Sequence, residues 1–201
     1  MARPKQQDSR REDLLHAARA AILQRGLQAT RVRDVADQAG VAAGTVTYYF
    51  RELDVLFDLV FAEAVERFCT ARERDADARS DPRDQLAAVL RSGLPTGPGD
   101  ELCCLLYEFS PQARQRPSDA RLRRELYGRQ VALYVRVLTA GAEAGRFRLQ
   151  RPADEIAANL VALEDAYGYH VIAQMFMTRD QAEKHLFGYA SLSVADPSMA
   201  L

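Results

Sequence analysis

Apolar residues recur along most of this chain at spacings of three and four positions, which is the pattern of amphipathic helices with one buried face. We find no segment with the strict alternation of a strand, no internal repeat and no low-complexity segment. The pattern therefore predicts an all-α protein of about nine helices. Capping residues, glycines and prolines place them at residues 9–25, 30–39, 43–50, 53–77, 82–92, 100–116, 117–144, 152–176 and 178–194.

Residues 32–51, VRDVADQAGVAAGTVTYYFR, contain two short helices joined by a tight turn. Gly40 can take a positive φ without a Cβ clash, so it can end the first helix and reverse the chain. This layout predicts a helix-turn-helix, in which the second helix enters a DNA major groove. The expected buried residues are Val35, Ala36 and Ala39 on the first helix, then Val46 with either Tyr49 or Phe50.

The outward positions of the second helix favour DNA binding over an ordinary helical hairpin. They carry short hydroxyls and an aromatic hydroxyl, which suit base edges, thymine methyls and phosphates, whereas a solvated face more often carries Glu and Lys. The basic arm residues Arg3 and Lys5 are further candidates for phosphate contacts. We expect DNA contacts from Arg33, Ala43, Gly44, Thr45, Thr47, Tyr48, Tyr49 and Arg51.

The segments 30–36, 40–45 and 48–50 resemble the DNA-binding signature of the TetR family of transcriptional regulators. Residues 106–109 and 145–147 are similar to the branch that contains the choline-responsive BetI-type repressors. The resemblance implies a three-helix head on a larger helical body. Three positions depart from the family pattern: Ala42 lacks a capping hydroxyl, Thr47 stands where tyrosine is frequent, and Leu53 stands where a phosphate-binding lysine is frequent.

Charge is unevenly distributed along the 201 residues, whose formal net charge is −1. Residues 1–51 hold nine Lys and Arg against five Asp and Glu, a net charge of +4, and the remainder holds eighteen against twenty-three. A basic end on a mildly acidic body suits a head that faces phosphates and a body that faces something else.

The sequence contains no pattern that indicates catalysis, a metal site or a cofactor. The three histidines are scattered, and neither a metal-ligand pair nor a nucleotide-binding or nucleophile motif is present. No apolar run could cross a membrane, and the N-terminus has no secretory core, so we expect a cytoplasmic protein. An odd cysteine count, Cys69, Cys103 and Cys104, fits reduced thiols, and a redox role of the adjacent pair stays open.

The body carries aromatic and acidic residues at inward spacings, which suggests a pocket for a mostly apolar organic effector. A carboxylate beside tyrosine rings slightly favours a cation. Alternatively, Glu164 faces solvent or pairs with one of the many arginines. The candidate ligand-binding residues are Cys103, Tyr107, Glu108, Tyr127, Tyr134, Glu164 and Tyr167.

These observations predict a ligand-responsive transcriptional regulator, most simply a repressor, with a DNA-binding domain at 1–53 and a ligand-binding and dimerisation domain at 54–201. Its partners are a double-stranded inverted-repeat operator, a small organic effector and a second copy bound through the last two helices. The rivals are a constitutive or architectural DNA-binding regulator without an effector, and a helical enzyme or carrier with a similar hairpin. The expected dimer face includes Ala157, Ala158, Ala162 and Gly168 and the stripe Leu186, Tyr189 and Leu192.

Overall fold

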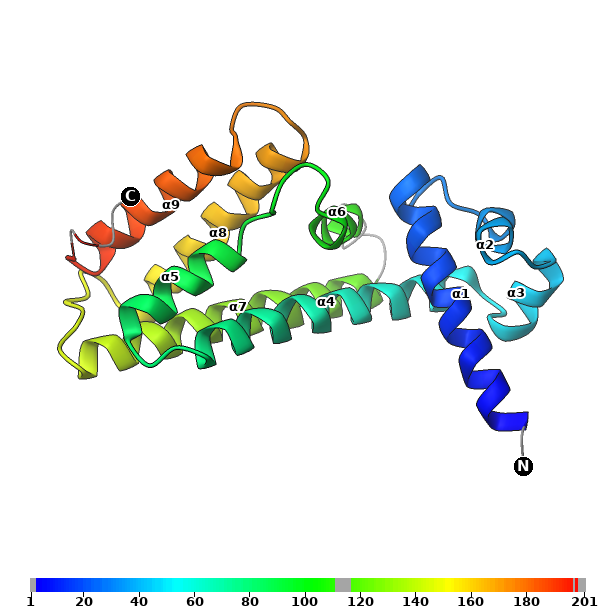
Figure 1. The fold of residues 1–201 in the computed structure, drawn as a ribbon, viewed down its shortest axis with the longest axis horizontal. Helices are drawn as coiled ribbons and strands as arrows, with labels where there is room; N and C mark the ends of the chain where they lie inside the picture. The colour runs from blue at the N-terminus through cyan, green and yellow to red at the C-terminus, as the bar shows by residue number, and fades with distance from the viewer. Residues whose placement is uncertain (1–2, 111–116, 197, 199–201) are drawn as a thin grey trace. The chain divides into compact units, whose positions relative to one another are not determined.

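The computed structural model describes residues 3–110, 117–196 and 198. The described residues form nine helices and no strand, so the expected all-α fold is confirmed (Figure 1). The helices are α1 (Arg3–Arg25), α2 (Val32–Ala39), α3 (Ala43–Tyr49), α4 (Leu53–Asp77), α5 (Pro82–Ser92), α6 (Glu101–Glu108), α7 (Pro117–Glu143), α8 (Ala153–Ile172) and α9 (Arg179–Ser193).

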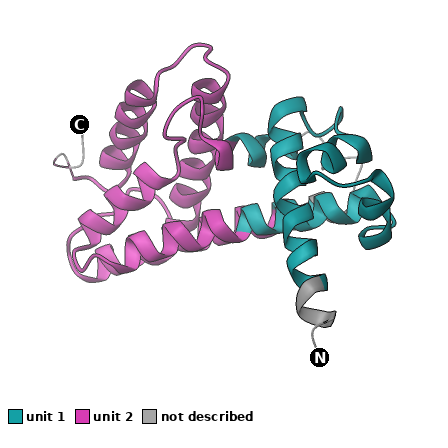
Figure 2. Ribbon diagram, turned by 45° about the vertical axis from the view of Figure 1, so that its right-hand side comes forward, with its two compact units in different colours: residues 1–65, 104–123 teal, residues 66–103, 124–201 magenta. Residues whose placement is uncertain are grey.

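The chain divides into two compact units, which Figure 2 shows in different colours. Unit 1 comprises residues 1–65 and 104–123, and unit 2 comprises residues 66–103 and 124–201. Three helices, α4, α6 and α7, therefore contribute residues to both units. The division into functional domains at residue 53 stays a prediction.

Unit 1 is built around the N-terminal helices. α1 packs on α2, and α2 packs on α3. The rings of Phe61 on α4 and Phe109 after α6 stack with centroids 4.4 Å apart, which joins both parts of the unit. The buried side chains include Leu14, Ala18, Ala21, Ile22, Val35, Ala36, Val46, Phe50, Leu56, Phe61 and Phe109.

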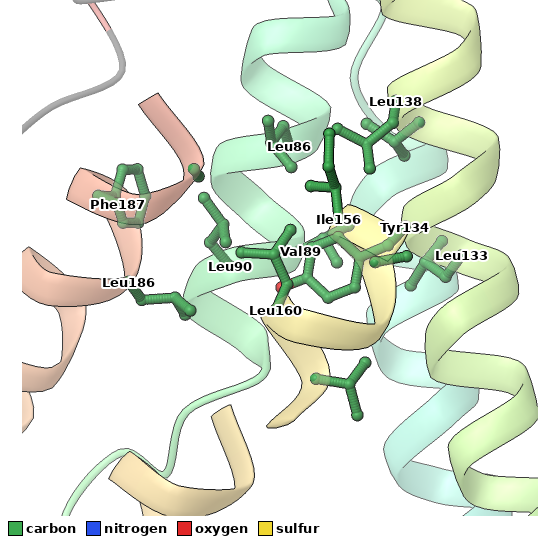
Figure 3. Packing of buried hydrophobic residues seen from close by; sticks show 14 of the residues in the cluster. Leu86, Val89, Leu90, Leu133, Tyr134, Leu138, Ile156, Leu160, Leu186 and Phe187 are labelled. Atoms are coloured by element: carbon green, nitrogen blue, oxygen red, sulfur yellow. The ribbon is translucent and has the colours of Figure 1, made fainter. Parts of the chain in front are cut away.

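Unit 2 has its own core between α5, α7, α8 and α9, together with Ala76 of α4. Figure 3 shows these side chains converging, with the Tyr134 ring beside Val89, Ile156 and Leu160. α8 packs along α9, and α5 contacts α9. Leu186 and Ala157 are fully buried in this core, and Gly168 of α8 is buried as well, so the expected place of these three residues on a dimer face is wrong.

Most expected helix boundaries agree with the structure, and three local expectations are wrong. α1 begins at Arg3, so Ser9 lies inside the helix and does not cap it. The N-cap of α2 is Arg31, because the Thr30 hydroxyl donates instead to the Gly26 carbonyl at 2.8 Å. α8 ends at Ile172, where Gln174 takes a φ of 50° and turns the chain.

The predicted kink at Pro111 and the second half of the helix expected at residues 100–116 lie outside the described residues. The described part of that helix, α6, ends at Glu108. The side chains of Arg3 and Lys5, expected to form a basic arm, also lie outside the description.

Candidate functional site

The turn between α2 and α3 has the geometry that Gly40 predicts. Gly40 has φ 64° and ψ 36°, the left-handed conformation that glycine adopts without strain. The Val41 N–H donates to the Ala36 carbonyl at 3.0 Å, and the Gly40 N–H donates to the Asp37 carbonyl at 3.2 Å. This Schellman arrangement satisfies the last carbonyls of α2 and fixes the direction in which α3 leaves.

α3 is held by its apolar side and by the residue that ends it. Val46 is 1% exposed, and Phe50, the C-cap, is 3% exposed, which resolves the choice between Tyr49 and Phe50. The Arg11 guanidinium lies 4.7 Å from the centre of the Phe50 ring, so α1 also secures this end. Ala42 gives α3 no side-chain cap, which forgoes roughly 1 kcal/mol of helix stability.

The opposite side of α3 is open to solvent. The Tyr48 side chain is 74% exposed and meets the half-buried Tyr49 ring edge-on, with centroids 5.2 Å apart. Gly44 and Thr47 are exposed, and nothing lies within 4 Å of a Cβ placed on Gly44. The Thr47 hydroxyl donates to the Gly44 carbonyl at 3.1 Å, so its proton is already used within the helix. The remaining two candidates on this helix, Ala43 and Thr45, are half-buried.

Arg33 on α2 and Arg51 just after α3 are exposed and pair with no described residue. Other arginines of the head are engaged. Arg25 contacts Asp34 at 3.0 Å, and Arg31 donates to the Gln28 carbonyl at 2.6 Å. Among the described side chains of the head, the guanidinium groups of Arg33 and Arg51 are therefore free to neutralise phosphates.

Unit 2 contains a fully buried polar cluster around Glu164. The Arg72 and Glu164 side chains are each 1% exposed, and Arg72 Nη2 lies 2.7 Å from Glu164 Oε1. Arg72 also donates to the Gln130 side-chain oxygen at 2.6 Å and to the Val89 carbonyl at 3.1 Å. The Tyr134 hydroxyl donates to the same Glu164 oxygen. Of the three interpretations left open for Glu164, a ligand carboxylate, a solvent-facing group or the partner of an arginine, the structure shows the pairing with an arginine.

The charges of this cluster compensate each other. Burial raises the pKa of the Glu164 carboxyl, and Arg72 opposes that shift. Burial disfavours the charged form of Arg72, but attraction to Glu164 and Tyr134 outweighs it and raises the pKa of the guanidinium. Burial also raises the pKa of the Tyr134 hydroxyl, so it remains a donor. A permanently charged guanidinium thus faces one carboxylate, and the carboxylate that favoured a cationic effector is already paired.

The other candidate ligand residues have separate environments. Glu108 Oε2 accepts a hydrogen bond from the Leu27 N–H at 2.8 Å, so this carboxylate contacts the loop between α1 and α2. Tyr127 is 48% exposed. Tyr167 is half-buried, packs against the unit 2 core and has its ring 6.1 Å from the His185 ring. Cys103 is buried, and Tyr107 is half-buried.

Sequence reasoning missed the two other polar residues of the cluster, Arg72 and Gln130. The signal for Arg72 was present, because it lies at helical spacing between Cys69 and Ala76 on the buried stripe of α4. A charged residue on an apolar stripe usually has a buried partner of opposite charge.

Three hollows on the described residues lie away from the candidate ligand residues. One of about 410 Å³ lies beside the turn after α8, where Met175 and Phe176 are exposed, and it also touches Gly97 and Pro98. Others lie beside Leu53 in unit 1 and beside Arg129 in unit 2. The pocket predicted among the helices from the fourth to the eighth therefore stays a prediction.

The described residues contain no cluster of His, Cys, Asp or Glu that could hold a metal ion. Within the same part of the chain, no helix is long and apolar enough to cross a membrane.

Comparison with known proteins relates both parts of the chain to bacterial regulators. The sequence model described as "Bacterial regulatory proteins, tetR family" matches residues 14–60, and "BetI-type transcriptional repressor, C-terminal" matches residues 82–191. The HTH-type transcriptional repressor KstR2 of Mycobacterium tuberculosis is 30% identical over 144 residues, 71% of this chain and 72% of KstR2.

Solved structures share the fold at lower identity. A transcriptional regulator from Saccharomonospora viridis in complex with choline has a TM-score of 0.84 and 22% identity, over 92% of this chain and 96% of that one. FadR from Bacillus subtilis in complex with stearoyl-CoA has a TM-score of 0.70 and 19% identity, over 92% and 98%. These likenesses show the fold alone.

Proposed function

Because this chain belongs to the TetR family of bacterial regulatory proteins, we propose that it is a cytoplasmic repressor which binds an inverted-repeat operator as a homodimer and is released by a small organic effector. The observation that carries the proposal is the outward face of α3. Tyr48, Thr47 and Gly44 are exposed there, and Arg33 on α2 and Arg51 just after α3 are exposed and unpaired. Short polar groups can read base edges, and the two arginines can contact the flanking phosphates.

The dimer is proposed to form through α8 and α9. A single recognition helix contacts too few base pairs to address one operator in a genome, so two heads are needed. The proposed face consists of residues of α8 and α9 that are exposed in a single chain. On α8 the exposed residues at helical spacing are Asn159, Ala162, Ala166 and Tyr169, and on α9 they are Gln181, His185 and Leu192 with the half-buried Gly188. Small residues at Ala162, Ala166 and Gly188 would let the helices of two copies approach closely.

The effector is proposed to bind within the helical body. The relatives with this fold carry ligands as different as choline and stearoyl-CoA, so the fold does not determine the ligand. Of the seven candidates, Cys103, Tyr134 and Glu164 are buried in the body, and the Tyr134 hydroxyl and the Glu164 carboxylate already bond within the cluster around Arg72.

Glu108 has a different role in this proposal. Its carboxylate at the end of α6 holds the Leu27 amide, next to Gly26 at the end of α1. A shift of α6 would therefore be transmitted to the loop that precedes α2. A ligand changes DNA affinity only to the extent that it binds one of the two shapes more tightly.

DNA binding is tested by fluorescence anisotropy with the DNA that lies immediately upstream of the chain's own coding sequence. Thr45→Ala and Tyr48→Phe should each weaken binding about tenfold, the scale of one lost base or phosphate contact. Both should leave the thermal melt nearly unchanged. Thr139→Ala removes a hydroxyl from an exposed position on α7 in unit 2 and should bind as the wild type does. Unchanged affinity in both α3 variants would remove this helix as the reader.

The effector and the dimer need separate tests. A thermal-shift screen of apolar acids, neutral molecules and cations should find a compound whose affinity falls when operator DNA is present, by the factor with which it weakens DNA binding. The absence of such a compound would favour the constitutive or architectural regulator. Sedimentation should give a dimer at micromolar concentration, and Ala162→Arg on the exposed face of α8 should make it a monomer. Ala71→Arg, on the exposed side of α4, is the control.

A further inference from the structure

The surroundings of the Arg72 guanidinium have the composition of a binding site for an organic cation. Its central carbon lies 5.2 Å from the centre of the Phe68 ring and 5.6 Å from the centre of the Tyr134 ring. The Glu164 carboxylate touches it at 2.7 Å. Two aromatic faces and a carboxylate around one positive charge form the arrangement by which proteins recognise alkylammonium and guanidinium ligands.

In this chain the cation is supplied by the protein. Arg72 comes from α4, the Tyr134 ring from α7 and the carboxylate of Glu164 from α8, so three separate helices meet at the guanidinium. The Val89 carbonyl of α5 and the Gln130 amide oxygen of α7 accept further N–H groups of Arg72. All of these groups belong to unit 2, and the guanidinium is 1% exposed.

A cation site that is already filled by an arginine disfavours cationic ligands. The negative charge of Glu164 is already compensated by Arg72, and both rings already face a cation. A second positive charge brought to these groups would be repelled by the guanidinium, and the one carboxylate beside it is already paired with Arg72. An uncharged or acidic molecule would meet no such repulsion.

We propose that Phe68, Tyr134 and Glu164 form a cation-binding site whose occupant is Arg72 of the same chain, and that Arg72 excludes organic cations from this regulator. The effector is then a molecule without a permanent positive charge. The statement about the effector rests on the proposed function. The cation site itself does not, since it can be measured by binding without any DNA.

Truncation of the occupant tests the proposal. Arg72→Ala should lose thermal stability and should recover it in millimolar ethylguanidinium or tetramethylammonium chloride, compared with sodium chloride at the same ionic strength. A shift of several degrees that saturates with concentration is the expected result. An ion pair with only a structural role also predicts the loss of stability, but it predicts no recovery by added cations.

Three proteins serve as controls. The wild type has its site filled, Arg72→Lys keeps a cation on the chain, and Arg72→Ala combined with Glu164→Gln lacks the carboxylate. None of them should gain stability from either cation or from choline. If Arg72→Ala does not fold alone, the test is refolding in the presence of ethylguanidinium. Recovery of folded protein supports the cation site, and failure to recover it overturns the proposal.

Two results would overturn the proposal directly. The first is an Arg72→Ala variant that folds and gains no more stability from the cations than from sodium chloride. The second is saturable binding of choline to the wild type that disappears in Glu164→Gln. A wild-type protein that does not bind DNA would contradict the proposed function. It would not change the conclusion drawn from either of these two results about the cation site.

Discussion

Gly93 gives the sharpest test of how tightly the buried cluster is held. It ends α5 with φ −78°, an ordinary conformation that alanine adopts equally well, so a substitution there meets no backbone strain. A Cβ on Gly93 would nevertheless fall far inside the contact distance of both carboxylate oxygens of Glu164. The end of a free glutamate could move away at little cost, but this one is held by Arg72 and Tyr134 and is 1% exposed.

Gly93→Ala should therefore break the pair of Glu164 with Arg72. Breaking a buried ion pair costs about 3–5 kcal/mol. The lower chain entropy of alanine in the unfolded state returns about 0.4–1 kcal/mol, which leaves a loss of about 2–5 kcal/mol. Since 1 kcal/mol corresponds to roughly 2–4 °C for a protein of this size, the melting temperature should fall by about 4–20 °C.

The assay is thermal and urea unfolding of four proteins: the wild type, Gly93→Ala, Glu164→Ala and the double variant. In the Glu164→Ala background the obstructing carboxylate is gone, so Gly93→Ala should lower the free energy of unfolding by less than about 1 kcal/mol. The effects of the two substitutions on stability should therefore be strongly non-additive, as expected for residues in contact. Gly128→Ala on α7, where nothing lies within 4 Å of the added Cβ, is the matched control and should gain up to about 1 kcal/mol of helix stability. Equal costs with and without Glu164, or no cost at all, would refute the reasoning.

Three further predictions concern charge and titration. Arg33→Ala and Arg51→Ala should each reduce the salt dependence of operator binding by about 0.9 in the slope of log affinity against log salt, measured by anisotropy. Glu108→Ala should remove the acceptor of the Leu27 amide, cost about 1.5 kcal/mol and accelerate hydrogen exchange at that amide, while an unchanged exchange rate would mean that the bond is not formed. Burial raises the pKa of the Cys69 thiol from 9.0 to about 11, so its stabilising contribution is complete below pH 9 and is lost as the pH rises towards 11. In urea unfolding, the wild type should lose about 2 kcal/mol more than Cys69→Ala between pH 9 and pH 11, and parallel curves would contradict the shift.

The fold and the DNA-reading helix could be predicted because they depend on local patterns. Helical periodicity gives the same buried face whatever the helix packs against, and Gly40 after an apolar stripe ends a helix by backbone sterics alone. The structure accordingly has α2, the left-handed turn and α3 where the sequence placed them. The predicted helix boundaries at Ser9, at Thr30 and at the end of α8 are wrong. At such positions the chain can form more than one local hydrogen-bonding pattern, and the sequence does not decide between them.

The body shows what the sequence could not decide. From periodicity alone, Glu164 and Leu186 could face a ligand, solvent or a second copy, because a stripe shows that a face is buried without showing what covers it. Only packing determined that Leu186 lies in the chain's own core. Only packing brought Arg72, which is 92 residues away in sequence, against Glu164 and turned a candidate ligand carboxylate into half of an ion pair. The helices and the turn between α2 and α3 thus follow from the sequence, because the interactions that form them act within a few residues. The partner of a buried charge is determined only when separate helices meet, since its stabilisation depends on distances that no local pattern encodes.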